Sequence, residues 1–162
     1  MSRLHMKKDP LEVVRLWLLI VLLIGLFGTG VELLLLKHVD GAWQLAPLAL
    51  VAGSLIVLAW YAVGRSLASL RAHQFVMILF IASGAIGTIQ HFRGNVAYER
   101  ESNPSLSGFD LYRAALMGST PSLAPGTMIQ LGLIGLMLTY RHPLYAGSTK
   151  PANEASTSRR TL

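Results

Sequence analysis

The sequence predicts an all-α integral membrane protein, a single four-helix bundle with a long outer loop between its third and fourth spans. Two compositional features and one pattern predict this class. Of 162 residues, 52% are hydrophobic and only 14% are charged, whereas soluble domains average ~25% charged residues. The apolar residues gather in long runs, and a membrane-spanning helix needs ~20 of them. Lys and Arg lie beside these runs, as they do beside membrane spans.

The first predicted span covers residues 16–36, after a basic N-terminal segment at residues 1–15. Glu32 is its one charged residue. A signal peptide would also have a basic start, but its apolar core is only ~7–15 residues long. Because this run is longer and continues past Glu32, we expect a retained helix.

The second and third predicted spans cover residues 45–63 and 72–92. Trp43 and Trp60 flank the second span, as interfacial aromatic residues do. The third span carries small residues four positions apart, which allow helix backbones to approach closely in lipid. These residues predict a packing face, either within the monomer or between copies of the chain. They are Ser83, Gly84, Gly87 and Thr88.

Residues 93–122 form the longest polar stretch and are expected to be the outer loop. Residues 109–117 within it are compatible with a short helix lying at the membrane interface. The fourth predicted span covers residues 123–140, and its Gln130 is expected to hydrogen-bond to another helix. Residues 141–162, rich in Ser, Thr, Pro and Ala, are expected to be a disordered cytoplasmic tail.

The distribution of basic residues predicts which side each connection faces. Four spans put both termini and the second connection on one side. The basic residues of that side are Arg3, Lys7, Lys8, Arg15, Arg65, Arg71, Arg141, Lys150, Arg159 and Arg160. The other side has Lys37, Arg93, Arg100 and Arg113. Because cytoplasmic loops are enriched in Lys and Arg, we expect both termini in the cytoplasm and the protein in a plasma membrane of the bacterial inner-membrane type.

Glu32 marks the predicted site. It lies roughly 9 Å from the middle of its span, inside the hydrocarbon, where a carboxylate is costly and needs a partner. Polar residues from the outer end of the third span lie at a similar depth. The predicted cluster contains Glu32, His38, Gln90, His91, Arg93, Asn95, Tyr98, Glu99 and Glu101. It is either a structural clasp, with Arg93 or His91 pairing Glu32, or a binding site for a cation, a proton or a small polar ligand.

Several kinds of chemistry find little support in the sequence. There is no cysteine, which excludes thiolate catalysis and cysteine-ligated metals. His38, His91 and Glu32 are weak metal candidates, because no spacing typical of a metal site occurs. No cofactor is predicted: the histidines lie at span edges, which disfavours haem. The net charge of +6 is assigned to membrane flanks, so no nucleic-acid partner is expected.

The sequence therefore favours a small non-enzymatic subunit or scaffold, with the bilayer, itself or a larger membrane complex as partners. No nucleophile elbow or phosphate-binding loop occurs, and the spans carry few polar residues. The first alternative is a transporter-like or ligand-, ion- or proton-sensing protein that uses the outer cluster around Glu32 and His91. The second is a membrane enzyme acting at the outer face. In all three cases, the outer ends of the first and third spans are expected to hold nearly all the polar chemistry.

Overall fold

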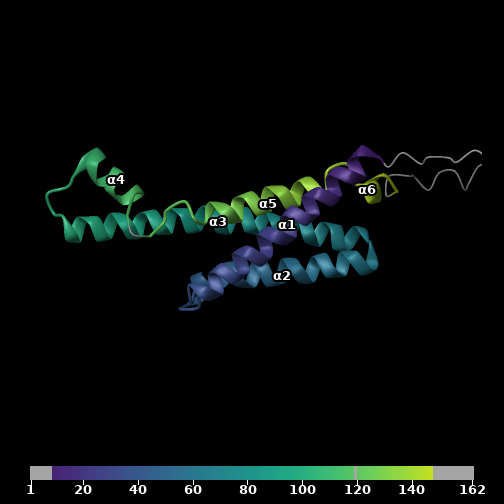
Figure 1. Ribbon diagram of the computed structural model, residues 1–162, viewed down its shortest axis with the longest axis horizontal. Coiled ribbons are helices and arrows are strands. Elements are labelled where there is room, and N and C mark those ends of the chain that lie inside the picture. The colour runs from purple at the N-terminus through teal and green to yellow at the C-terminus, as the bar shows by residue number, and fades with distance from the viewer. Residues whose placement is uncertain (1–8, 119, 148–162) are drawn as a thin grey trace, which may run out of the picture.

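The computed structural model describes residues 9–118 and 120–147, and this part of the chain is helical with no strand. Figure 1 shows α3 along the whole length of the molecule, with α5 beside it and α1 crossing both. The all-α class is thus confirmed. The helices are α1 Pro10–Leu35, α2 Ala42–Gly64, α3 Leu67–Ser102, α4 Gly108–Leu116, α5 Gly126–Leu138 and α6 Pro143–Gly147. The basic residues 1–8 and most of the predicted tail lie outside the described residues.

Three helices, α1, α2 and α3, are long and apolar enough to cross a membrane. Their outward faces are apolar as well: Ile24 of α1, Ile56 of α2 and Phe75 of α3 are each at least 63% exposed. Large apolar side chains exposed on every long helix require an apolar surrounding. The first three predicted spans lie within these helices, and the chain is a small integral membrane protein with three candidate spans.

The fourth predicted span corresponds to a shorter helix. α5 has 13 residues, which at 1.5 Å per residue cover about 20 Å, less than the ~30 Å hydrocarbon core. The reason lies at its start, where residues 122–125 form turns and Pro125 precedes the first helical residue. α5 nevertheless packs against α1 and α3. Its Leu131 and Met128 join Leu22, Leu26 and Phe80 in one buried core.

Glycine permits the close approach of α3 and α5. A Cβ at Gly84 would lie 2.7 Å from the Pro125 carbonyl oxygen, and one at Gly132 would lie 2.7 Å from the Met77 carbonyl oxygen. Either distance is too short for two atoms in contact, so the backbones meet where side chains are missing. The small residues Gly84 and Gly87 of the predicted packing face thus lie against α5 of the same chain.

The helix α3 is longer than the predicted third span, because it continues past Phe92 to Ser102. Its 36 residues rise about 54 Å, which exceeds the ~40–45 Å of a bilayer with its headgroups. Its C-cap is Asn103, the residue before Pro104, where a helical conformation is disfavoured. The first part of the expected outer loop is therefore helix rather than loop.

α4 turns back along this projecting end of α3, at residues close to the predicted interfacial helix. Leu111 and Ala115 are buried on its inner side, and the ring of Tyr112 stacks on Phe92 with centroids 6.1 Å apart. We call the side of the bundle that holds α4 and the 36–41 turn the loop side. The opposite side, where α1 begins and α5 ends, is the terminal side.

Candidate functional site

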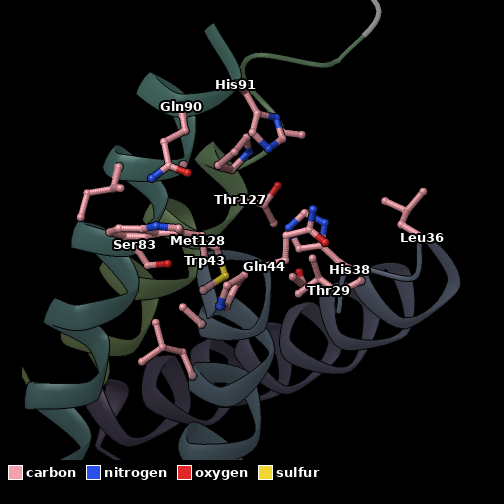
Figure 2. A pocket seen from close by; sticks show the side chains of 18 of the residues that line it. Thr29, Leu36, His38, Trp43, Gln44, Ser83, Gln90, His91, Thr127 and Met128 are labelled. Atoms are coloured by element: carbon pink, nitrogen blue, oxygen red, sulfur yellow. The ribbon is translucent and has the colours of Figure 1, made fainter. Parts of the chain in front are cut away.

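A groove opens on the loop side between two pairs of helices. Its walls come from the loop-side ends of α1 and α2 and from the facing parts of α3 and α5, and its volume is about 930 Å³. Figure 2 shows Gln90 and His91 at the upper end of α3, facing His38 and Gln44, with Thr127 of α5 between them. The groove is therefore bounded by segments far apart in the sequence.

The polar rim of the groove contains four residues of the predicted cluster. Glu32 comes from α1, His38 from the following turn, and Gln90 and His91 from α3. Gln44 and Trp43 at the start of α2 complete the rim. Neither of these two was predicted as a site residue, because a residue that opens an apolar span looks like an ordinary interfacial flank.

The deeper part of the groove is apolar. Leu50 of α2, Leu79, Ala82 and Ile86 of α3, and Met128 of α5 line it. Between Leu79 and Gly94, which both line the groove, α3 rises about 22 Å. That length is about half of a bilayer with its headgroups. The groove thus has the length of one lipid leaflet and the same polarity gradient.

His91 is held in a defined orientation at the rim. Its Nδ1 lies 3.1 Å from the Pro121 carbonyl oxygen, and since a carbonyl only accepts, Nδ1–H must be the donor. In the neutral ring Nε2 therefore carries the lone pair and is the nitrogen left to accept a hydrogen bond. A ligand at the rim would meet this acceptor, or a second donor if the ring is protonated.

The Glu32 side chain is exposed on α1. Within the described part of the chain it forms no ion pair with Arg93. Arg93 is exposed on α3 and does not line the groove. The acidic group that the sequence singled out therefore lies at the groove with its oxygens available to a ligand.

The other members of the predicted cluster lie on the projecting end of α3, away from the groove. Asn95 is buried beneath α4, and its Nδ2 donates to the carbonyl oxygens of Ala115 at 2.9 Å and Thr120 at 2.6 Å. Glu99 accepts a hydrogen bond from Asn103, while Tyr98 and Glu101 are exposed. The structure thus divides the predicted cluster into a groove rim and an anchor for α4.

The predicted helix-packing residues other than glycine do not form one shared contact. Ser83 lines the groove, and Thr88 donates to the Gly84 carbonyl oxygen of its own helix at 2.9 Å. Gln130 is exposed on α5, with no hydrogen bond to any described side chain or backbone group outside its helix. Among residues 9–118 and 120–147, no three His, Asp or Glu side chains gather closely enough to hold a metal ion.

A second polar network, which the sequence did not suggest, lies on the terminal side. Gln74 of α3 donates to Thr139 at 3.0 Å and accepts from the Tyr145 hydroxyl at 2.7 Å. Beside it, the Tyr61 hydroxyl lies 2.8 Å from His142 Nε2. These contacts tie the segment after α5 to α2 and α3. The sequence signal that could have revealed them is Gln74, a polar residue just inside the third predicted span.

The surroundings of His142 in this network favour its neutral form. Its Nδ1 accepts a hydrogen bond from the Leu144 N–H at 3.3 Å, so Nε2 carries the proton and donates to Tyr61. Burial lowers the pKa of His142, and the positive charge of Arg15 lowers it further. Both effects favour the uncharged ring that the hydrogen bonds require.

Three comparisons, with protein-family models, with curated proteins and with solved structures, find no match to this chain.

Proposed function

We propose that this protein binds a membrane lipid in the loop-side groove. The observation that carries the proposal is the groove's gradient, which is mostly apolar from Leu79 to Ile86, apart from Ser83, and polar at Gln90 and His91. An acyl chain needs apolar walls at leaflet depth, and a headgroup needs polar partners at the interface. The proposal uses part of the same outer cluster as the ligand-sensing alternative from the sequence, but it assigns a lipid in place of the cation, proton or small polar ligand expected there.

The rim favours a zwitterionic phospholipid. The carboxylate of Glu32 and the Nε2 lone pair of His91 complement an ammonium group, and the imidazole of His38 can donate a hydrogen bond to a phosphate. Gln44 and Gln90 each add amide donors and acceptors. An ethanolamine phospholipid carries both charges at the spacing of one headgroup, so it is the occupant we propose.

The proposed topology completes this picture. α5 is taken as a fourth, short crossing that closes the bundle, with both termini in the cytoplasm. The bias of Lys and Arg toward the terminal side supports it. In this orientation the groove opens to the outer leaflet of the membrane.

The proposal predicts quenching of Trp43, which lines the groove, by a brominated lipid. Trp17 and Trp60 are first changed to Phe, so that Trp43 is the only fluorophore. In detergent, brominated phosphatidylethanolamine should quench Trp43 with saturation near one lipid per protein. Ala82→Phe fills the groove and should raise the lipid concentration for half-quenching on the order of tenfold, about 1.4 kcal/mol.

The matched control is Ala85→Phe, on the same helix, exposed, and outside the groove lining. It should leave the quenching curve unchanged. Equal quenching curves in the two variants would contradict the proposal, because the lipid would then reach Trp43 from the micelle and not from the groove.

A second candidate function, a subunit of a membrane complex, is favoured by the outward face of α4. Phe109 and Met117 are 80% and 77% exposed there, at the end of a helix longer than a bilayer. A photo-crosslinking residue at position 109 should yield a protein adduct in native membranes. The same residue at Val63, which is exposed on the span α2, should yield lipid adducts. Lipid adducts at both positions would instead indicate that α4 lies on the membrane surface.

A further inference from the structure

A second groove lies on the terminal side, between α1 and α5. Its walls are Leu11, Val14 and Leu18 of α1 and Leu133, Leu136 and Met137 of α5, and its volume is about 590 Å³. Among the described residues, Arg15 and Tyr140 alone add polar groups to the lining. This groove shares no lining residue with the loop-side groove.

Arg15 is fixed at the mouth of this groove by the end of α5. Its Nη2 donates to the carbonyl oxygens of Tyr140 at 3.2 Å and Arg141 at 2.8 Å. Its Nε is buried and has no acceptor among the described residues. A guanidinium has five N–H donors, so part of its donor capacity remains for a further acceptor. The two carbonyls hold the charge in place without neutralising it.

A second cation lies near Arg15, and no described Asp or Glu forms an ion pair with the Arg15 guanidinium. The guanidinium of Arg141 lies over the ring of Tyr140, 5.7 Å from its centroid. No Asp or Glu of residues 9–118 or 120–147 lines the groove. Tyr140 is 64% exposed, as expected for an aromatic residue at headgroup level. An apolar groove with the Arg15 guanidinium at its mouth, and a second guanidinium beside Tyr140, complements an anionic amphiphile.

We infer that this groove is a binding site for an anionic phospholipid, whose phosphate contacts Arg15 and Arg141 while an acyl chain lies between α1 and α5. Guanidinium groups bind phosphate through charged hydrogen bonds. Polybasic membrane flanks attract anionic lipids in the same way. The inference is independent of the lipid proposed for the loop-side groove, because the headgroup charge and the side of the membrane differ and the two grooves use different residues of α1 and α5.

The test is binding of phosphatidylglycerol and phosphatidylcholine to the full-length protein in detergent, measured by native mass spectrometry. The unchanged protein should bind phosphatidylglycerol more tightly than phosphatidylcholine. Arg15→Gln should weaken phosphatidylglycerol binding on the order of tenfold, as expected for the loss of charged hydrogen bonds. Arg71→Gln removes an exposed charge of α3 outside the groove lining and should change nothing.

A second variant separates binding from folding, because Arg15 also holds the end of α5. Leu133→Trp fills the groove from a position that is 51% exposed and leaves Arg15 in place. It should weaken phosphatidylglycerol binding by a similar factor with little change in thermal stability. Unchanged binding in folded Leu133→Trp, or equal binding of the two lipids by the unchanged protein, would overturn the inference.

Discussion

Replacing Gly132 with alanine is expected to destabilise the bundle by about 1–3 kcal/mol, the range for overpacking a filled interior. The added Cβ would lie 2.6 Å from Ile81 Cγ1 and 2.7 Å from the Met77 carbonyl oxygen. A side chain can rotate away, but the Met77 carbonyl belongs to the backbone of α3. The two helices must therefore separate, which also weakens the core around Met128 and Leu131.

The control for this prediction is Gly126→Ala on the same helix, where an added Cβ would meet no atom within 4 Å. Alanine there should be neutral or stabilising by up to about 1 kcal/mol, because glycine is the weaker helix former. Thermal unfolding in one detergent compares both variants. Equal stability of the two variants would show that α3 and α5 do not meet at Gly132.

Replacing Asn95 with alanine is expected to release α4 from α3. Asn95 is 2% exposed, and its amide also donates to Ser122 Oγ at 3.1 Å. Truncation leaves buried carbonyl and hydroxyl groups without their donor, at about 1–3 kcal/mol for each group left unsatisfied. Amide hydrogen exchange in residues 111–116 should become at least about tenfold faster. A loss of about 1.4 kcal/mol of local stability raises the population of the open, exchanging state tenfold.

Asn103→Ala is the matched control, because Asn103 is exposed at the end of α3 and its amide contacts only Glu99. Exchange in α4 should stay within a factor of about two of the unchanged protein, as expected for an exposed contact. If both variants leave exchange in α4 unaltered, the hydrogen bonds of Asn95 do not hold this helix.

The spans that were predicted well depend on a property that the sequence displays directly. Apolar runs of bilayer length, as in α1 and α2, report lipid contact without any knowledge of tertiary structure. The same criterion could not locate the end of α3, because hydrophobicity ends at the membrane surface whereas helical hydrogen bonding continues into water. Pro104, rather than the loss of apolar residues, marks where that helix stops.

The sequence predicts which residues share a depth in the membrane, and the candidate site was predictable only to that extent. Glu32, His38, Gln90 and His91 were grouped because their heights match, and they line one groove. The position of Asn95 along its span did not reveal that its side chain is buried against α4. Arg15 was missed as a site residue because its acceptors are backbone carbonyls 125 and 126 positions away. Every residue type has a backbone carbonyl, so the residue types at those positions give no sign of the contact.

The most direct test of lipid binding in the loop-side groove is a count of bound lipids by native mass spectrometry. The full-length protein, Ala82→Phe and Ala85→Phe are each delipidated and then supplied with phosphatidylethanolamine. One tightly bound phosphatidylethanolamine is expected on the unchanged protein and on Ala85→Phe, and its loss is expected from Ala82→Phe. The same number of bound lipids on all three proteins would contradict lipid binding in the loop-side groove.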